Sequence, residues 1–417
     1  MGKLSEILKE RGYVNQYSSK TLEEITDGQK RTLYLGIDPS ADSLQMGQLM
    51  GFLILRRFLE DGHKVILVIG GGTGMIGDPG GKSTERPLLD AEMVKHNAEK
   101  IAEQTKHLLG SSNFTVVNNT EWLEPLRTID FLRNVGKHFT VNTMLQRDFV
   151  KDRVKNADEG ISYTEFSYAL LQSYDYLHLH LEYGCDLQVG GSDQWGNIVS
   201  GVDFIRRKTG DTVYALTWPL LVNKATGKKF GKSESGTVWL DSSKTSPFQF
   251  YQFWINVADD DVEDYLLKMT ALSKIEIGAA LELSRRDKKE RTAQQILARE
   301  VTTLVHGERA ANTAKAVSEI LFGARNITEL DADTLAMLQN DAPSCEVQRG
   351  ESILEVLVRS NLATSKREAR QLLTSRAILL NSETIDEPER ALVEGDFIRD
   401  IAILRRARRN VCVLTLG

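Results

Sequence analysis

Residues 34–48 read YLGIDPSADSLQMGQ, and this stretch predicts a strand, a turn and the start of a helix. The apolar run 32–37 has the length of a short buried strand. The Asp-Pro pair after it stops the strand because proline cannot donate a backbone hydrogen bond. Residues 47–59 form a strongly apolar helical pattern that closes at an Asp-Gly pair, as helices commonly do. The run 64–69 then predicts a second buried strand, which completes a strand–helix–strand unit.

The alternation of strands and helices continues beyond this unit. Further strands are expected at 114–117, 186–190 and 213–216, and further helices at 90–110, 129–139, 163–183 and 193–207. Strands that alternate with helices are typical of a parallel sheet covered on both faces, the doubly wound α/β class. In such folds ligands bind at the carboxyl ends of the strands, where the segments 34–38, 70–78 and 188–194 are expected to lie.

The chain divides by composition into four parts. We predict a doubly wound, Rossmann-like domain over residues 1–225. After residue 247 the strands stop and the sequence becomes helical and charged, which predicts an α-helical domain within 226–325. Residues 326–350 are mixed and polar, and we expect a linker with a short helix there. Residues 351–417 combine two helices with short strands, which predicts a small α+β domain.

The formal net charge is −6, so any contact with nucleic acid must come from a local basic patch. The three cysteines are far apart in the sequence, which argues against a disulfide framework and against a metal site. No apolar run reaches the roughly 18 residues of a membrane span. The N-terminus carries charges where a secretory signal is apolar. We therefore expect a cytoplasmic protein without a membrane anchor and without a metal held by its own ligands.

The stretch 228–233 reads KKFGKS and places lysines on both sides of a glycine, in a predicted loop after an apolar strand. Lysine ammonium groups bind polyphosphate, and glycine lets the backbone come close to the anion. A solvated turn is the other interpretation of such a stretch taken alone. The GKS triplets at 81–83 and 231–233 do not make a P-loop, because the earlier glycine that a P-loop needs is absent.

A glycine-rich run at 72–77 reads GTGMIG, which has the spacing of a dinucleotide-binding fingerprint. That fingerprint needs a helix that opens within the motif, and the loop-forming DPGG follows here instead. A second pattern indicates an amino-acid pocket, because Tyr168, Gln172 and Asp175 fall on one face of one predicted helix. Together with Asp78, the first two would hold an ammonium group. A half-buried polar helix face is the alternative.

Five motifs together resemble those of bacterial tyrosyl-tRNA synthetases, which are class I aminoacyl-tRNA synthetases. The motifs are Tyr34–Leu44, Ile76–Pro79, Thr164–Tyr168, Gln188–Asn197 and Lys229–Ser233, in the family's order and with similar spacing over essentially the whole chain. The resemblance implies a tyrosine–tRNA ligase, which activates L-tyrosine with ATP to tyrosyl-adenylate and pyrophosphate and then charges the 3′ end of tRNA(Tyr). It also implies Mg²⁺ that arrives with ATP, and a homodimer whose interface helix resembles residues 131–139.

The resemblance further implies a role for each matching residue. Tyr34 and Asp175 would read the substrate phenol, and Asp78, Tyr168 and Gln172 would hold its ammonium group, with Asn119 and Gln188 nearby. The ATP site would comprise Gly36, Asp38, Ser40, Gly47, Gly191, Asp193, Gln194 and Lys232. The phosphates would contact Lys229, Lys232 and Ser233 of the loop, together with Lys82 and Arg86. Such a site needs no nucleophilic side chain, since activation depends on positioning two anions and stabilising phosphate charge.

The chain departs from the family at two positions around Gly47, where Gln45 and Gln48 stand in place of histidines. Glutamine can donate a hydrogen bond to a ribose or phosphate oxygen, but it never carries a positive charge. Losing one charge-assisted bond costs about 1–3 kcal/mol, or about one or two decades in rate. We expect a working ligase with an altered rate, because the phosphate-binding lysines and arginine remain. A paralogue that only binds RNA is the alternative.

The C-terminal segment resembles a small RNA-binding fold shared with a ribosomal small-subunit protein, the S-four-like fold, through residues 365–370, 377–381 and 394–396. In the family this fold is appended to grip tRNA. Lys366, Arg367 and Arg370 would present one helix face to phosphates, with a solvated helix end as the alternative. The usual glycine after the asparagine of the second motif is Ser382 here. Further RNA contacts would come from the arginine cluster Arg405, Arg406, Arg408 and Arg409.

Two other functions remain to be distinguished. A nucleotide-dependent oxidoreductase, the interpretation of the GTGMIG run, would bind a nicotinamide and show no response to tyrosine. A tryptophan-specific relative shares the fold, but the pair Tyr34 and Asp175 and the C-terminal RNA module both argue against it.

Overall fold

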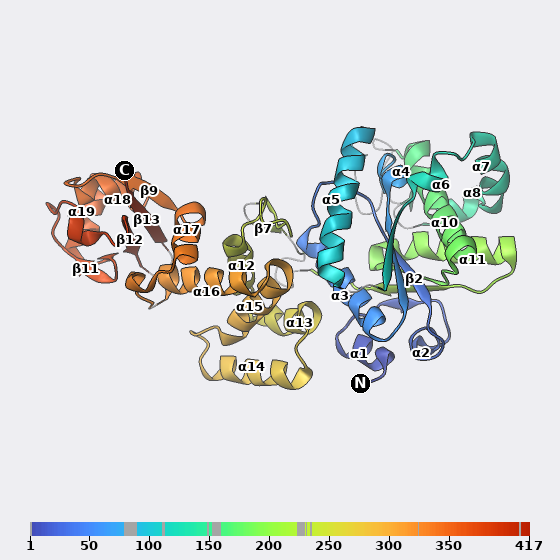
Figure 1. Ribbon diagram of the computed structural model, residues 1–417, viewed down its shortest axis with the longest axis horizontal. Helices are drawn as coiled ribbons and strands as arrows, with labels where there is room; N and C mark the ends of the chain where they lie inside the picture. Colours follow the sequence, from blue (N-terminus) through green and yellow to red (C-terminus); the bar gives the residue numbers. More distant parts are fainter. Residues whose placement is uncertain are drawn as a thin grey trace. The chain divides into compact units, whose positions relative to one another are not determined.

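The computed structural model describes residues 2–78, 90–110, 113–147, 150–151, 160–222, 230, 232–233, 236–323, 325–407 and 410–417. The chain forms two compact units. One comprises Met1–Asp241 with Glu263–Leu272, and the other comprises Ser242–Val262 with Ser273–Gly417. Figure 1 shows the elements of both units along the chain.

The first unit is built on a described sheet of six strands in the order β1-β6-β5-β2-β3-β4. The strands are β1 (Gln16–Tyr17), β2 (Thr32–Ile37), β3 (Lys64–Ile69), β4 (Phe114–Asn118), β5 (Leu187–Gly191) and β6 (Tyr214–Trp218). β2 to β6 run parallel, and β1 pairs antiparallel with the edge of β6. From β2 the chain adds β3 and β4 on one side of the sheet, and it then adds β5 and β6 on the other side. The carboxyl end of β2 is therefore the topological switch point, where such folds bind ligands.

Helices cover both faces of this sheet. The described helices are α1 (Leu4–Glu10), α2 (Leu22–Thr26), α3 (Met46–Glu60), α4 (Gly71–Gly74), α5 (Ala91–Leu109), α6 (Thr120–Leu123), α7 (Thr128–Asn134), α8 (Val141–Leu145), α10 (Tyr163–Tyr183) and α11 (Trp195–Thr209), with the 3₁₀ turns η1 (Gly136–His138) and η2 (Ser192–Gln194). α3 and α5 pack together beside β3, whereas α10 packs on α11, which contacts β5 and β6. Figure 1 shows these two pairs on opposite sides of β2, so the doubly wound class predicted from the sequence is confirmed.

Local capping signals determine where the long helices begin and end. α10 starts after Ser162, whose side chain accepts a hydrogen bond in the first turn, and ends at Gly184 with φ 65°. α5 has the same pattern, with an N-cap aspartate and a left-handed glycine. A left-handed residue after a helix favours glycine because any Cβ is strained there. The spans 163–183 and 90–110 predicted from the sequence therefore agree with the structure.

Two predicted segments differ from the structure. The helix expected over 129–139 is interrupted at the buried Val135, which has φ −112° and ψ −62°, and only the turn η1 follows. The sequence predicted that no helix opens within the GTGMIG run, but the one-turn helix α4 begins at Gly71 and ends within that run. Because α4 ends after four residues, it lacks the continuing helix of a dinucleotide-binding fingerprint.

The second unit joins a helical part to a small sheet. Its helices are α12 (Pro247–Ile255), α14 (Lys274–Arg286), α15 (Thr292–His306), α16 (Glu308–Phe322), α17 (Ala332–Asp341), α18 (Ile353–Arg359) and α19 (Lys366–Thr374), with η3 (Ile327–Glu329) and η4 (Glu394–Asp396); α13 (Asp259–Met269) spans the boundary between the units. Its strands are β9 (Ser344–Val347), β10 (Ile378–Leu380), β11 (Glu383–Ile385), β12 (Ile401–Arg406) and β13 (Asn410–Leu416), in the order β11-β10-β12-β13-β9. Apolar residues of α12, α16, α17, β12 and β13 share one core.

Residues 326–350, expected from the sequence as a linker with a short helix, contain such a helix, α17, and also the packed strand β9. β9 pairs parallel with β13 and alternates exposed and buried residues, with Cys345 and Val347 inward. Leu338 of α17 is fully buried in the core shared with the helices. The sequence of this segment is polar on average because only one face of each element is apolar. That face is buried against other elements of the unit, which the sequence pattern alone does not show. Across the residues described, the structure contains no helix with the length and apolar character needed to span a membrane.

Candidate active site

Asp175, on α10, is a buried carboxylate with 4% of its surface exposed. Trp122 Nε1 donates to one of its oxygens at 2.7 Å, and Asn119 Nδ2 donates to the other at 3.0 Å. Burial raises the pKa of the Asp175 carboxyl to about 7, although both hydrogen bonds act to lower it. A buried carboxyl that titrates near neutrality is a candidate functional group.

The hydroxyl of Tyr34, on β2, is buried and has no hydrogen-bond partner within the described part of the chain. Burial, and after it the charge of Asp175, raises the pKa of this hydroxyl well above its usual range, so it stays protonated. A buried hydroxyl without a partner costs free energy that a bound ligand can recover. The structure therefore brings Tyr34 and Asp175 within electrostatic reach, and together they suit a ligand that carries a hydroxyl.

Asn119, which follows β4, connects Asp175 to the carboxyl end of β2. Its Oδ1 accepts from Gly72 N at 2.8 Å, and its Nδ2 also donates to Thr73 Oγ1 at 3.0 Å. Thr73 Oγ1 donates in turn to Asp38 Oδ1 at 2.8 Å. The network thus joins the ends of β2, β3 and β4, which are neighbours in the sheet. This is the edge at which a doubly wound fold binds its ligand.

Gly70 makes this arrangement sterically feasible. A Cβ added there would lie 2.2 Å from Asp38 Oδ1 and 2.4 Å from Thr73 Oγ1, far inside contact distance. The glycine run after β3 therefore serves close packing between the ends of two strands, which explains a pattern that resembles a nucleotide fingerprint without forming one.

Of the residues expected to bind an ammonium group, Tyr168 and Asp78 each have a different hydrogen-bond partner. Tyr168 Oη donates to Asp38 Oδ2 at 2.8 Å, whereas Asp78 accepts from Gln194 Nε2 at 2.6 Å. Burial and then the charges of Asp38 and Asp78 raise the pKa of the Tyr168 hydroxyl, so both carboxylates lie close to it. Gln172 is half-buried on the same helix. Several carboxylates beside one phenol create a negative potential that suits a cationic group.

The residues expected to bind ATP lie around the same edge of the sheet. They are Gly36, Asp38 and Ser40 at the end of β2, Gly47 in the first turn of α3, and Gly191, Asp193 and Gln194 at the end of β5 and in η2. Gly36, Ser40, Gly47 and Asp193 are exposed, as a ligand-binding surface requires. Gln188, on β5, is buried, and its Oε1 has no partner among the described residues.

Gln48 forms a capping box at the start of α3. Its Oε1 accepts from Gln45 N at 2.8 Å, so the other end of the amide, its NH₂ group, remains a donor. Next to this cap, Met46 N donates to Val238 O at 2.9 Å, and Gln45 forms a bridge with Trp239. The chain that leaves the lysine-rich loop is therefore attached directly beside the N-terminus of α3, a position that favours anions.

The predicted phosphate-binding cations fall largely outside the described residues. This is the case for Lys82, Arg86 and Lys229. Lys232 and Ser233 form the strand β7, which pairs antiparallel with β8 (Gly236–Thr237), and only their backbone is described. Phe230 O lies 3.5 Å from the Cβ position of Gly47, so the backbone at Phe230 lies beside the start of α3.

Sequence reasoning missed three residues of this site: Thr73, Trp122 and His178. Thr73 and Trp122 follow β3 and β4 directly, so their place after a parallel strand was a usable signal. His178 has no such signal, because among the described residues it is linked to the site by a ring stack on Trp122.

On the second unit, the basic face predicted on α19 is exposed. Lys366 pairs with Glu355 at 2.7 Å and Arg370 with Glu389 at 3.1 Å, while Arg367 is exposed beside them. The arginine cluster near the C-terminus, expected from the sequence to contact RNA, is used differently in the structure. Arg405 donates to the carbonyls of Ile320 and Gly323, and Arg406 donates to Leu362 O and Glu368, both at 2.9 Å. These two guanidinium groups hold the fold together; Arg408 and Arg409 lie outside the described residues.

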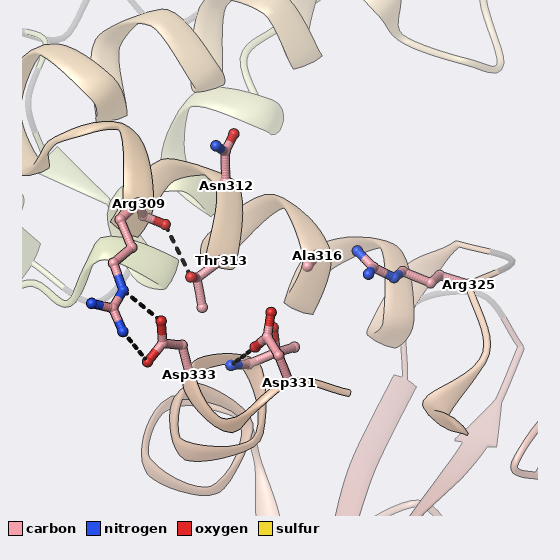
Figure 2. Close-up of a pocket in the computed structure, with 8 residues that line it drawn as sticks. Arg309, Asn312, Thr313, Ala316, Arg325, Asp331 and Asp333 are labelled. Atoms are coloured by element: carbon pink, nitrogen blue, oxygen red, sulfur yellow. Dashed lines mark hydrogen bonds and ion pairs between the residues drawn. The ribbon is translucent and has the colours of Figure 1, made fainter. Parts of the chain in front are cut away.

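A hollow of about 340 Å³ on the second unit is a separate candidate (Figure 2). It is lined by Arg309, Asn312, Thr313, Ala316, Arg325, Asp331, Asp333 and Thr334. Arg309 makes a two-pronged pair with Asp333 at 2.6 and 2.8 Å, and Asp331 caps α17 by accepting from Thr334 N at 2.7 Å. Because Arg309 and Asp333 already pair with each other, the hollow is a weaker candidate than the network around Asp175. Over the described ranges, no cluster of three His, Cys, Asp or Glu side chains could hold a metal ion.

Two family models match the chain. The model for tRNA synthetases class I (W and Y) matches residues 26–323, and the model for the tyrosine–tRNA ligase SYY-like C-terminal domain matches residues 334–414. The two matches follow one another along the chain.

Full-length relatives carry one activity in their names. The tyrosine–tRNA ligase of Roseiflexus castenholzii is 46% identical and covers 98% of both chains, and that of Escherichia coli is 43% identical over 98% of this chain and 97% of its own. Among solved structures, a C-terminally truncated mitochondrial tyrosyl-tRNA synthetase from Aspergillus nidulans is similar. Its TM-score is 0.68 at 30% identity, over 75% of this chain and 92% of that one.

Proposed function

The chain belongs to the family of class I tRNA synthetases, in its tyrosine–tRNA ligase branch, and from this premise we propose how its site works. It activates L-tyrosine with ATP to give tyrosyl-adenylate and pyrophosphate, and it then transfers tyrosine to the 3′ end of tRNA(Tyr). The observation that carries the proposal is the buried Tyr34 hydroxyl, which has no partner among the described residues, beside the buried Asp175 carboxyl.

Tyr34 and Asp175 read the phenol of the substrate. The substrate hydroxyl donates to a carboxylate oxygen and accepts from the Tyr34 hydroxyl, which satisfies both groups. Phenylalanine enters the same site but leaves the Tyr34 hydroxyl without a partner and gives the buried Asp175 carboxylate no hydroxyl donor, and that cost excludes it. The raised pKa of Asp175 supports this assignment, because a hydroxyl donor favours the ionised form that burial disfavours.

The ammonium group of the substrate binds at the opposite end of the network, near Tyr168. Asp78, Tyr168 and Gln172 hold it, and Asp38 adds negative charge through its bond to the Tyr168 hydroxyl at 2.8 Å. Asn119 and Gln188 line the space between. This orientation directs the substrate carboxylate toward the exposed edge formed by Gly36, Ser40, Gly47 and Gly191, where we place the adenosine and α-phosphate of ATP.

The chemical step needs no nucleophilic side chain. The substrate carboxylate oxygen attacks the α-phosphorus, a new P–O bond forms, and the bond to the β-phosphate breaks as pyrophosphate leaves. Lys82, Arg86, Lys229, Lys232 and Ser233 stabilise the charge that builds on the phosphates, with Gln45 and Gln48 at the start of α3 as neutral donors. Asp193 and Gln194 hold the ribose. Mg²⁺ would arrive with ATP and would neutralise part of the phosphate charge.

The tRNA is held by the second unit. We propose residues 1–225 as the catalytic domain, 226–325 as the phosphate loop and helical domain, and 351–417 as the S-four-like RNA-binding domain. The exposed α19 residues Lys366, Arg367 and Arg370 contact tRNA phosphates. Their ion pairs with glutamates are exposed and therefore weak, so phosphates can replace the glutamates.

The enzyme acts as a cytoplasmic homodimer. Exposed apolar side chains gather on α7 and α8: Ile129, Leu132, Val141 and Leu145 are between 40% and 73% exposed. A cluster of this kind on neighbouring segments is typical of a contact surface. These side chains flank residues 131–139, which the sequence predicts at the interface, and Leu132 lies within them.

Exchange of labelled pyrophosphate into ATP tests the function directly. We expect exchange that depends on tyrosine and is far weaker with phenylalanine or tryptophan. Binding of tRNA(Tyr) without exchange would instead support the paralogue that Gln45 and Gln48 raise as the alternative. Binding of a nicotinamide with no response to tyrosine would contradict both.

A further inference from the structure

The indole of Trp122 is held at two points by one face of α10. Its Nε1 donates to Asp175 Oδ1 at 2.7 Å. Its ring stacks on the imidazole of His178, with 4.4 Å between centroids and 19° between planes. Asp175 and His178 are three residues apart, so both face the same side of the helix.

The two oxygens of Asp175 are oriented by different means. Oδ2 is held by Asn119, whose own side chain is fixed by the backbone of Gly72 at 2.8 Å. Oδ1 is held by Trp122, which rises from the short helix α6. A stacked ring cannot tilt without losing contact, so the stack on His178 fixes the direction of the indole N–H.

We propose that His178 is a positioning residue for recognition of the substrate hydroxyl, acting through Trp122 on the carboxylate of Asp175. The inference rests on the proposed function, since it concerns the same site. In this proposal His178 touches neither substrate nor reacting atoms. It acts only on the Asp175 carboxylate, the protein group that distinguishes tyrosine from phenylalanine.

A purely structural role makes a different prediction. Trp122 belongs to the apolar core of the first unit, so loss of the stack could lower stability without changing recognition. In that case the binding of tyrosine and of phenylalanine would change by the same factor. If His178 positions Asp175, its loss weakens only the binding of tyrosine, because phenylalanine has no hydroxyl to present to Asp175.

The test compares His178→Ala with His178→Phe, which restores a flat ring. His180→Ala is the matched control, because His180 lies on the same helix but bonds to Cys185 O and Asp211 at 2.9 and 3.1 Å. Tyrosine-dependent pyrophosphate exchange yields KM and kcat, and phenylalanine as a competitor yields its KI.

We expect His178→Ala to raise the KM for tyrosine by about threefold to tenfold, the range of one stacking contact. The KI of phenylalanine and kcat should change far less, His178→Phe should restore KM, and His180→Ala should leave both constants unchanged.

A double-mutant cycle tests the route through Trp122. In a Trp122→Phe background the N–H is gone, so His178→Ala should have no further effect on the KM for tyrosine. Equal changes in KM and KI, an unchanged KM, or a full additional effect in that background would each overturn the inference. If His178→Ala does not fold, His178→Leu fills the space without a flat ring and takes its place. Absence of tyrosine-dependent exchange in the wild type would overturn the proposed function instead.

Discussion

At the scale of single residues, Asp175, which we propose reads the substrate phenol, also links the stability of the fold to pH. Burial raises the pKa of its carboxyl to about 7 in the folded chain, while the unfolded chain ionises near the ordinary value of 3.8. The folded state therefore holds the proton more tightly. The stability that Asp175 contributes is complete below about pH 4 and is lost as the pH rises toward 7.

Asp175→Asn removes this dependence. Between pH 4 and pH 8 the free energy of unfolding of the wild type should fall relative to the variant by up to roughly 4 kcal/mol. The same substitution should weaken tyrosine binding by about tenfold to a hundredfold, since it removes a charge-assisted acceptor. Urea unfolding at both pH values and tyrosine-dependent exchange measure the two effects. Parallel pH profiles for the two proteins would contradict the assignment.

Ser382 occupies a position that suits glycine. It lies with Asn381 in the two-residue turn between β10 and β11, where both residues have positive φ, 49° for Asn381 and 75° for Ser382. Turns of this geometry favour Asn-Gly because a Cβ is strained at the second position. The side chain of Asn381 keeps the turn in place by accepting from Ile403 N at 2.8 Å.

Ser382→Gly should therefore raise the free energy of unfolding by about 0.5–1 kcal/mol, as relief of left-handed strain exceeds the added freedom of the unfolded chain. Ser375, with φ −81°, is the matched control, and Ser375→Gly should lower stability. Urea unfolding of the full chain measures both variants. A loss of stability in Ser382→Gly would show that the turn is not strained.

At the scale of elements, the start of α3 combines a helix cap with a ligand donor in one side chain. The Oε1 of Gln48 caps the helix, and its NH₂ group is the donor proposed for ATP. Gln48→Glu retains the capping oxygen and adds a charge that a helix N-terminus favours, but it loses the donor. We expect an unchanged melting temperature and a kcat/KM for ATP at least about tenfold lower. Gln48→Leu should lose both properties, and unaltered ATP kinetics in Gln48→Glu would refute the donor role.

The helix α19 is the element proposed to contact tRNA phosphates. Arg367→Ala should raise the KM for tRNA and lower the salt dependence of tRNA binding by about one unit of slope, as expected for one lost phosphate contact. Tyrosine-dependent pyrophosphate exchange should not change, because that reaction needs no tRNA. Arg376→Ala is the matched control, since Arg376 is an exposed arginine of the same unit that pairs with Asp386. Equal effects of the two substitutions would indicate a general charge effect.

At the scale of the whole molecule, the apolar cluster on α7 and α8 predicts the oligomeric state. Val141→Glu and Ile129→Glu each place a charge where a dimer would bury a side chain, so they should shift the protein toward monomer. Ile275→Glu is the control, because Ile275 is 85% exposed on α14, outside this cluster. Analytical ultracentrifugation measures the outcome. A wild type that remains monomeric at micromolar concentration would contradict the dimer.

Local signals in the sequence determined the class of fold and the limits of its main helices. Ser162 and Gly184 delimit α10 through interactions within one turn of the chain, and the alternation of apolar strands and helices requires a sheet covered on both faces. The family motifs fall at the ends of neighbouring parallel strands, which must meet, so the sequence predicted one place for the site. Only the tertiary structure decided which side chains are partners. That Tyr168 bonds to Asp38, that Trp122 is held between Asp175 and His178, and that Arg405 holds the fold all depend on segments far apart in sequence. Such contacts are selected by packing of whole elements, which no local pattern records.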